Sequence, residues 1–451
     1  MNLYEDLFRQ FLYPFYEGVL RRRGTLKYLA EYERTQWLSA EEIAALQWSR
    51  LKRLVEHCWR EVPYYQRQWK ALGFNPSDMR SRADFELLPV IGKSEVRANF
   101  EDLHASSMRG RMLYKTTGGS TGEPMRFGYT RESYERRVAV MWRGYGWAGA
   151  RMGRRTLYLW GGALGEPGWL ESIKERFYHR IFNRRMFNAF GMDDSRMREF
   201  ADAIRRFRPA IIVGYAGPLY HFAQWIGRTG GRVPVPVSVL SAAEALEDYQ
   251  RETIESAFGC PVYNTYGCRE FMLIASQCAD CGNLHVNADH LFVELGDRAT
   301  NGRGAEAGEV VITDLHNWGM PLLRYRNGDL ATPAPVPAHR CARGLPILGK
   351  VVGRKLDMLR TRNGRTLPGE FFPHLLKDVA GVRRFQVIQE RLDLLVMLVV
   401  AGPEFGAEQE AGIRRELARV LGPSMELVIR RVDDIPLTPG GKLRVTISRL
   451  P

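Results

Sequence analysis

The segment from Lys115 to Pro124, KTTGGSTGEP, constrains this chain more than any other short stretch. Its glycines and hydroxyl residues let backbone N–H groups and side-chain donors approach an anion closely. Alternating residues at 112–114 and 125–129 predict a strand on each side of the loop. A Walker loop would instead run through Gly-Lys-Ser/Thr into a helix, whereas Glu-Pro follows the last glycine here. We therefore expect a polyphosphate loop that is not a P-loop. A plain Gly/Ser hairpin turn is the alternative.

The bulk composition is that of a folded globular protein. The chain has 451 residues, of which 45% are hydrophobic and 26% charged, and this length predicts two or three structural units. No run approaches the roughly 18 apolar residues that would span a bilayer, and the acidic N-terminus lacks a signal core. We expect a cytoplasmic protein without a transmembrane segment. The oligomeric state stays open, a homodimer included.

The net charge is +14. A strongly positive net charge is typical of nucleic-acid-binding proteins. The excess, however, consists mostly of arginines that are scattered along the chain rather than gathered in one basic block. A scattered excess is typical of a solvated surface, and it also suits a phosphate-rich substrate. We expect no nucleic-acid partner.

Strands alternate with helices over much of the chain, which indicates a layered α/β fold. The expected strands are 156–160, 210–214, 235–240, 262–265 and 309–313, and the expected helices are 195–207 and 219–226. The tail has the pattern of a small α/β unit, with strands 385–389, 394–400 and 426–431 and a helix at 408–421. We expect a large N-terminal domain, residues 1–352, and a small mobile C-terminal domain, residues 353–451.

The opening of the chain, residues 1–88, has a helical pattern. Leu3, Leu7, Phe8 and Phe11 recur at helical spacing. Further on, Ser39 with Glu42 predicts a capping box at the start of a second helix. We expect the first helix to pack on the main domain. Contact with a membrane surface is the alternative for an aromatic, basic N-terminal helix.

Four further segments are each weak signals alone. Tyr266–Glu270 offers an aromatic face, a glycine turn and a carboxylate, and Tyr325–Asp329 reads as a polar turn whose carboxylate suits two vicinal hydroxyls. Gly353–Asp357 is a basic segment, and Pro436–Arg444 is a Gly/Pro loop that presents a lysine. Their order along the chain is more informative than any one of them.

In this order, the segments resemble the adenylate-forming superfamily of acyl-CoA ligases, nonribosomal adenylation domains and luciferases. The resemblance extends from Thr116 to Lys442. Within the superfamily the chain looks most like the phenylacetate–CoA ligase branch, because Val62–Tyr65, Leu88–Lys93 and Arg208–Pro209 before Gly214–Tyr215 are similar to that branch.

This resemblance implies a role for each matching residue. Glu270 would ligate Mg²⁺, Asp329 would bind the ribose hydroxyls, and Arg354 would add a cation beside the nucleotide. Lys442 would bridge the acyl carboxylate and the α-phosphate during adenylation. The remaining residues would bind ATP: Thr116, Thr117, Gly118, Gly119, Ser120, Thr121 and Gly122 at its β- and γ-phosphates, and Ala243, Glu244, Tyr266 and Gly267 at its adenosine.

The chain departs from the family pattern before Glu270. Arg269 stands where the family usually has Thr or Ser, which puts a hydroxyl contact to phosphate at that position in doubt. The arginine would replace that contact or gate the acyl site. A milder change is Gly119, which precedes Ser-Thr-Gly where Ser is frequent.

The six cysteines do not form the framework of a small secreted domain. Cys278 and Cys281 form a C-x-x-C followed by His285, and Cys341 lies on a Pro/Arg-rich stretch. Three thiolates and an imidazole make a closed tetrahedral Zn²⁺ site. The alternative is reduced cysteines in a turn beside a surface histidine.

The resemblance implies an AMP-forming ligase. A carboxylic acid would attack the α-phosphate of ATP, and the acyl-adenylate would pass its acyl group to coenzyme A while the C-terminal domain swings about Asp357. Transfer to an amine or a carrier-protein thiol is one alternative. A nucleotide-binding module without catalysis is another, against which Lys442 and Glu270 argue. The acid is not identified, although Trp160, Tyr215 and Tyr220 are candidates for an aromatic pocket.

Overall fold

The computed structural model describes most of the chain. The described residues are 3–117, 125–161, 169–190, 192–300, 306–334, 341–351, 359–362, 366–367, 369, 371–376, 379–422, 424–435 and 445–450. The expected domain boundary near residue 352 lies outside them and stays a prediction.

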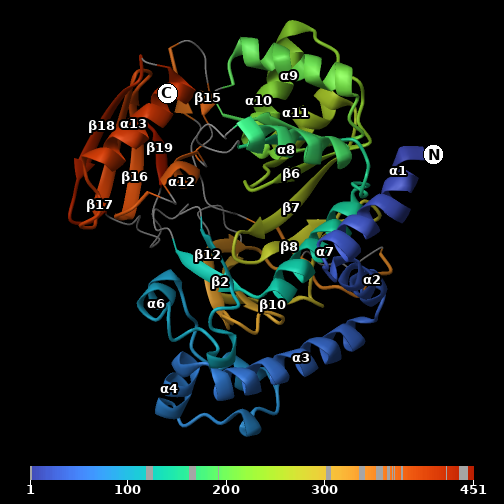
Figure 1. The fold of residues 1–451 in the computed structure, drawn as a ribbon, viewed down its shortest axis with the longest axis vertical. Helices are drawn as coiled ribbons and strands as arrows, with labels where there is room; N and C mark the ends of the chain where they lie inside the picture. The colour runs from blue at the N-terminus through green and yellow to red at the C-terminus, as the bar shows by residue number, and fades with distance from the viewer. Residues whose placement is uncertain are drawn as a thin grey trace.

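An eight-stranded mixed sheet forms the centre of the molecule (Figure 1). The strands from β4 to β7 are parallel, and those from β7 to β13 are antiparallel. Every residue of β5 and β6 is buried, as expected for parallel strands that are covered on both faces. The order in the sheet is β13 (Ile347–Leu348), β9 (Leu284–Val286), β8 (Met272–Gln277), β7 (Val262–Cys268), β6 (Ser238–Ala242), β5 (Ile211–Tyr215), β3 (Thr156–Trp160) and β4 (Arg184–Asn188).

Helices cover the two faces of the parallel part of this sheet. Successive side chains of a strand point to opposite faces, so Ile212 packs with one group of helices and Ile211 and Val213 with the other. The first group is α9 (Asp194–Phe207), α10 (Ala216–Thr229) and α11 (Asp248–Phe258). The second group includes α2 (Thr25–Thr35) and α7 (Arg131–Trp147), and α8 (Trp169–Ile181) precedes β4. The predicted α/β class is confirmed.

The first hundred residues are helical. The capping box expected at Ser39 is present: its hydroxyl accepts from the N–H of Glu42, and the Glu42 carboxylate accepts from the N–H of Ser39. The helices are α1 (Leu3–Leu7), α3 (Ala40–Glu61), α4 (Pro63–Ala71), α5 (Arg82–Glu86) and α6 (Lys93–Ala98), with π-helical η1 (Phe8–Leu12) and η2 (Phe15–Leu20) and 3₁₀ turns η3 (Pro76–Asp78) and η4 (Ser106–Met108).

Buried ion pairs join helix α7 to the segments around Asp289 and Asp314. The Arg143 guanidinium on α7 makes two bonds to the Asp289 carboxylate, at 2.5 and 2.8 Å, and Arg137 lies 2.7 Å from Asp314. All four side chains are at most 3% exposed. Removing one member of such a pair leaves a buried uncompensated charge, so these contacts fix α7 in place.

A hairpin and a three-stranded sheet lie beside the central sheet (Figure 1). Strands β1 (Leu113–Thr116) and β2 (Arg126–Tyr129) pair antiparallel, which confirms the two strands expected around the glycine-rich loop. Strands β10 (Leu291–Thr300), β11 (Glu306–Asp314) and β12 (Tyr325–Ala331) form the second sheet.

The C-terminal part is a small α/β unit, drawn orange to red in Figure 1. Its sheet has the order β18-β17-β16-β19, and the strands and helix expected at 385–431 are all present. Its elements are β14 (Leu359–Arg360), β15 (Thr366–Leu367), α12 (Phe371–Leu376), β16 (Val382–Arg391), β17 (Leu394–Ala401), α13 (Ala407–Leu421), β18 (Glu426–Arg431) and β19 (Thr446–Ser448).

Two sequence-based expectations need correction. The strand expected at 235–240 begins at Ser238, because Pro236 has no N–H to give to a ladder. The segment Tyr325–Asp329, expected as a turn, is part of strand β12. The strand is irregular at this place: its pairing with β11 shifts register at Glu309–Val311, and Gly328 has a positive φ. This irregularity explains why the sequence there looks like a turn.

Candidate functional site

The candidate nucleotide site is built where several strands end. Thr116 ends β1, Tyr266 and Gly267 lie near the end of β7, Ala243 follows β6, and Asp329 lies on β12. Segments far apart in sequence are thereby brought together, as expected for the crevice beyond the carboxyl ends of parallel strands.

The base of the glycine-rich loop is closed by Thr117. Its N–H donates to the Met125 carbonyl at 2.8 Å, and its hydroxyl accepts from the Met125 N–H at 2.9 Å. Thr117 is only 3% exposed. The predicted phosphate-binding residues Gly118, Gly119, Ser120, Thr121 and Gly122 lie outside the described residues. Thr117 thus holds the two ends of the loop together.

Arg269 connects β7 to the glycine-rich loop. Its guanidinium donates to the Thr116 carbonyl at 2.9 Å. This residue occupies the position where the sequence departs from the family pattern. The departure therefore places a cation next to the start of the loop instead of a hydroxyl.

Lys115 is a further cation at this place, and sequence reasoning did not assign it a role. Its ammonium lies 5.5 and 5.4 Å from the ring centres of Tyr129 and Tyr134. Burial, and then the charges of Arg137 and Arg269, lower its pKa. Like charges held together at the base of a loop attract a polyanion. The signal in the sequence was its place immediately before Thr116.

Glu270 is buried, and the Tyr325 hydroxyl that bonds it also lies 3.8 Å from the Met125 sulfur, next to the loop's second strand. Glu270 is 4% exposed, and its Oε1 accepts from the Tyr325 hydroxyl at 3.0 Å. Tyr325 is fully buried, so this bond fixes the carboxylate in one orientation. A fixed carboxylate beside a phosphate-binding loop is the donor that Mg²⁺ takes together with substrate phosphates. The residues present therefore fit the expected magnesium ion.

Tyr266, Asn327 and Asp329 form a hydrogen-bonded triangle. The Tyr266 hydroxyl donates to Asp329 Oδ2 at 3.0 Å, and Asn327 Nδ2 donates to the Tyr266 oxygen and to Asp329 Oδ2, both at 2.8 Å. Burial, and then the Asp329 charge, raise the pKa of Tyr266 well above its usual range, so the phenol stays neutral. The triangle orients the carboxylate expected to bind the ribose. Sequence reasoning assigned no role to Asn327.

Gly267 is required by close backbone packing. A Cβ atom at this position would lie 1.9 Å from the Met272 carbonyl oxygen. Any side chain would therefore push β8 away from β7. This explains the glycine beside Tyr266 without reference to a ligand.

Ala243 and Glu244 follow β6. Ala243 is exposed and has a φ of 65°, in the left-handed region that disfavours side chains with a Cβ. Glu244 Oε2 accepts from the Gly217 N–H, at the start of α10, at 2.6 Å. Burial raises the pKa of Glu244 to about 7, although this hydrogen bond acts against the rise.

We expect Glu244→Gln to stabilise the protein at about pH 8. A carboxyl group whose pKa rises on folding contributes stability that is full below its unfolded pKa and is lost as the pH rises through its folded pKa, here from 4.5 to about 7. The amide keeps the acceptor for Gly217 and carries no charge. The free energy of unfolding in urea should rise by about 1–2 kcal/mol at that pH and change little near pH 5. Glu252→Gln, at an exposed position on α11, is the matched control, and an equal gain there would contradict the assignment.

Three residues predicted from the family pattern cannot be placed. Arg354, Lys442 and the hinge residue Asp357 lie outside the described residues. Their roles stay predictions.

Cys278, Cys281, His285 and Cys341 come together at the end of β8. Their ligand atoms all lie within 4.8 Å of one another, with Cys278 Sγ 4.0 Å from Cys341 Sγ and Cys281 Sγ 3.3 Å from His285 Nε2. Tetrahedral zinc with bonds of about 2.3 Å to sulfur separates its ligand atoms by roughly 3.5–3.8 Å. The cluster has the size of a zinc site.

Two neighbours support this geometry. His285 Nδ1 lies 3.1 Å from the Leu345 carbonyl, the type of bond that directs Nε2 of a histidine to a metal. The Arg343 guanidinium lies 2.9 Å from the Cys278 sulfur and 3.1 Å from the Cys341 sulfur. Its charge acts against the burial that raises the pKa of Cys278 to about 12, and the pKa of Cys341 is lowered. The expected meeting of Cys341 with the C-x-x-C is present in the structure.

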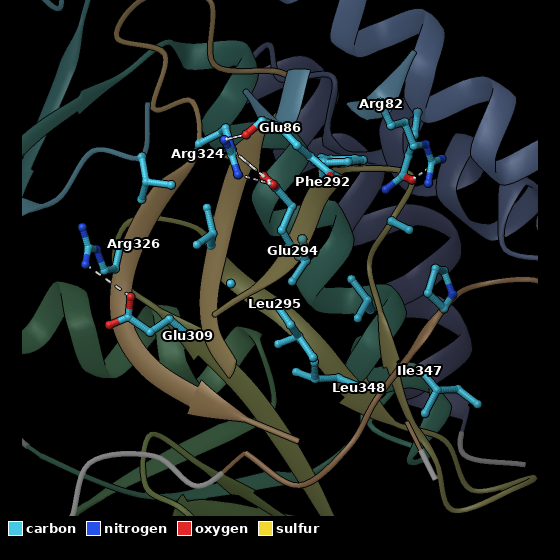
Figure 2. Close-up of a pocket in the computed structure, with 18 residues that line it drawn as sticks. Arg82, Glu86, Phe292, Glu294, Leu295, Glu309, Arg324, Arg326, Ile347 and Leu348 are labelled. Carbon is cyan, nitrogen blue, oxygen red and sulfur yellow. Dashed lines mark hydrogen bonds and ion pairs between the residues drawn. The ribbon is translucent and has the colours of Figure 1, made fainter. Parts of the chain in front are cut away.

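An open cavity of about 720 Å³ lies elsewhere, on the outer side of β10–β12 (Figure 2). Successive side chains from Arg324, just before β12, to Asn327 alternate between the two places. Arg324 and Arg326 line the cavity, and Tyr325 and Asn327 belong to the nucleotide site. Two ion pairs lie in the cavity, Arg324 with Glu294 at 2.9 Å and Arg326 with Glu309 at 3.3 Å. The cavity is therefore separate from the candidate site.

Solved structures define the fold. The chain is similar to 2-hydroxyisobutyryl-CoA ligase in the postadenylation state in complex with R3-HIB-AMP, with a TM-score of 0.57 and 20% identity, over 92% of this chain and 91% of that one. The same ligase with 2-HIB-AMP and CoA in the thioesterification state gives a TM-score of 0.57. The chain therefore has the fold of these CoA ligases.

Curated proteins give the nearer relatives. Protein CapK of Staphylococcus aureus is 24% identical over 437 residues, 96% of this chain and 94% of its own length. The phenylacetate-coenzyme A ligase of Thermus thermophilus is 27% identical over 443 residues, 90% of this chain and 96% of its own, and that of Escherichia coli is 25% identical over 429 residues, 90% and 95%. Residues 359–449 match the family of CapK C-terminal domains. The resemblance to the adenylate-forming ligases, and among them to the phenylacetate–CoA ligase branch, is confirmed.

Proposed function

We propose that this protein is an AMP-forming ligase that activates a carboxylic acid with ATP and transfers the acyl group to coenzyme A. The observation that carries the proposal is the set of contacts that links the ends of β1 and β7 with β12: Arg269 with Thr116, Glu270 with Tyr325, and Tyr266 with Asp329. Similarity to phenylacetate-coenzyme A ligases over about nine-tenths of the chain supports it.

Each residue of the candidate site has a part in this proposed reaction. Asp329, oriented by Tyr266 and Asn327, holds the ribose, and Ala243 and Glu244 border the adenine. Lys115 and Arg269, at the start of the glycine-rich loop, attract the phosphates. Mg²⁺, held through Glu270, would neutralise charge on those phosphates. Arg354 and Lys442 complete the site as cations beside the nucleotide and the acyl carboxylate.

We propose an aromatic acid as the substrate. Trp160 ends β3, Tyr215 ends β5, and their ring centres lie 4.5 Å apart. A side chain at Gly161 would collide with the ring of Phe190, which packs against the same strand end. Tyr215 and Phe190 are 0% and 3% exposed, so half-buried Trp160 is the ring of these three that an acid would contact. We call the three rings the aromatic wall, which lies at the carboxyl ends of the parallel strands, where substrates bind in such folds.

A substrate screen tests the function. Pyrophosphate release from ATP is measured with aryl, fatty and amino acids, each with and without coenzyme A. The proposal requires release with aryl acids and a coenzyme A thioester as product. Release without thioester formation would favour an amine or a carrier-protein thiol as acceptor. ATP binding without release for any acid would favour a nucleotide-binding module.

We also propose that Cys278, Cys281, His285 and Cys341 hold one structural Zn²⁺. The four ligand atoms would close the coordination shell, so the ion would take no part in chemistry. It would join the end of β8 to the segment around Cys341, which is 63 residues away from Cys278 in the chain. Six free cysteines fit the reducing cytoplasm in which we place the protein. A homodimer stays a prediction that light scattering tests.

Protein purified without added metal should contain about one zinc per chain. Cys341→Ser should lose this zinc and lower the melting temperature, because a closed zinc site contributes free energy to folding. Cys260→Ser, at another buried cysteine outside the cluster, should keep the metal. Zinc-free wild-type protein whose melting curve is unchanged by a strong chelator would show that the cluster is a set of reduced thiols.

A further inference from the structure

The first helical segment, Leu3–Leu20, has one face packed on the protein. Phe8 and Tyr13 are 1% and 2% exposed, and both rings meet Phe182 edge to face at 5.2 and 5.8 Å. The Tyr4 hydroxyl donates to the Ile181 carbonyl at 2.6 Å. The expected packing of this helix on the main domain is therefore present.

The opposite face of the segment is an exposed apolar row. Its side chains are Leu3, Leu7, Phe11, Phe15 and Val19, which are 86%, 47%, 63%, 55% and 60% exposed. They recur every four residues. The π-helical stretches η1 and η2 hold more residues per turn than the 3.6 of an α-helix, so this spacing keeps the side chains in line. Leu12 and Leu20, 38% and 62% exposed, widen the row.

Basic residues surround the row. Arg21 and Arg22 are exposed at its C-terminal end. On the neighbouring helix α8, Phe177 is 64% exposed and lies among the exposed Arg176 and Arg180. A shallow hollow of about 640 Å³ between the two helices is lined by Tyr4, Arg155, Phe177, Arg180, Ile181 and Asn183. We define the exposed face of Leu3–Arg22 together with this part of α8 as the N-terminal face.

The acidic residues of the first segment are already paired. Asp6 lies 2.6 Å from Arg9, Glu5 lies 3.5 Å from Arg154, and Glu17 is buried 3.4 Å from Arg23. On α8, Glu175 lies 3.3 Å from His179, but burial lowers the pKa of this histidine, so the carboxylate keeps its charge beside Arg176 and Arg180. The exposed Arg21, Arg22, Arg176 and Arg180 outnumber this one carboxylate, so the N-terminal face is basic.

We propose that the N-terminal face docks on an anionic lipid surface. An apolar row with arginines beside it has the pattern of a helix that lies in the plane of a membrane, with its apolar side chains at the boundary of headgroups and acyl chains. The arginines would bind lipid phosphates, each strengthening binding about fivefold. A second copy fits less well, because a two-fold interface would bring the same arginines of both copies together in a protein whose net charge is +14.

The N-terminal face lies on the side of the molecule away from the C-terminal unit (Figure 1). In Figure 1 the N-terminal helix lies at the right edge of the molecule and the C-terminal unit at the left. Among the described residues, no helix is long and apolar enough to cross a bilayer. Docking would therefore be peripheral and reversible.

Vesicle flotation of the full chain tests the proposal. Vesicles of phosphatidylcholine with phosphatidylglycerol should float the wild-type protein, and vesicles of phosphatidylcholine alone should float much less. The double variant Phe11→Glu/Phe15→Glu should reduce binding to anionic vesicles by roughly tenfold or more, because two exposed aromatic anchors become charged. Arg22→Gln should reduce it by about fivefold, and rising salt should weaken wild-type binding.

Leu87→Glu is the matched control, since Leu87 is 81% exposed and lies on another part of the surface. It should float like the wild type. The melting temperature and pyrophosphate release of all variants should match the wild type, which separates this proposal from the proposed function. Equal flotation of the double variant and the wild type would overturn the proposal. So would a dimer in light scattering that the double variant converts to a monomer, without vesicle binding by the wild type.

Discussion

Replacing Glu270 with Gln should slow adenylation by roughly a hundredfold and weaken its dependence on Mg²⁺. The buried carboxylate is held by the Tyr325 hydroxyl at 3.0 Å. Glutamine keeps an acceptor for that hydroxyl, so the fold should persist while the charge that attracts the metal is lost. Pyrophosphate release, measured over a range of magnesium concentrations, gives both effects.

Two further variants distinguish the effect of the Glu270 charge from the effect of its orientation by Tyr325. Tyr325→Phe removes the bond to Glu270 and keeps the ring, so it should cause a smaller loss of rate with the magnesium dependence retained. Glu309→Gln, at a carboxylate 40% exposed outside the site, should be neutral. A Glu270→Gln enzyme with wild-type rate and magnesium titration would show that the metal is held elsewhere.

Replacing Lys442 with Ala should reduce adenylation by roughly 10²–10³, with little change in stability. The lysine is expected to contact the acyl carboxylate and the α-phosphate while charge develops in the transition state. Formation of the thioester from a supplied acyl-adenylate should survive, because the swing of the C-terminal domain would take the lysine away before that step. Pyrophosphate exchange measures the first step by itself.

Lys350→Ala is the control for loss of a lysine. Lys350 lies 3.0 Å from Glu247 at the surface, so its removal should leave the rate unchanged. Pyrophosphate exchange near the wild-type rate in Lys442→Ala would remove this residue from the proposed site.

The sequence was informative where a local pattern has one physical explanation. The capping box at Ser39 and the strand at 156–160 depend on neighbouring residues alone, and both are present. The glycine-rich loop predicted its flanking strands because alternation on each side reports a pleated backbone. The C-x-x-C with His285 was readable for the same reason, since its spacing is local.

Other features depend on contacts between distant segments. Nothing in the sequence places the Arg269 guanidinium against the Thr116 carbonyl, 153 residues away. Asn327 received no role because its partner Tyr266 lies 61 residues earlier. The antiparallel extension of the sheet through β8, β9 and β13 was likewise invisible, since strand order is decided by packing and not by local propensity.

Strands β5 and β6 are buried at every position, so few of their side chains can change without cost to the core. The aromatic wall is different, because Trp160 is half-buried at the end of β3. Redesign of acid selectivity should therefore begin at the strand ends and leave the strands themselves intact. The residues expected to contact the acid can then be changed while the buried strands that support them stay the same. This makes the chain a practical starting point for engineered acyl activation.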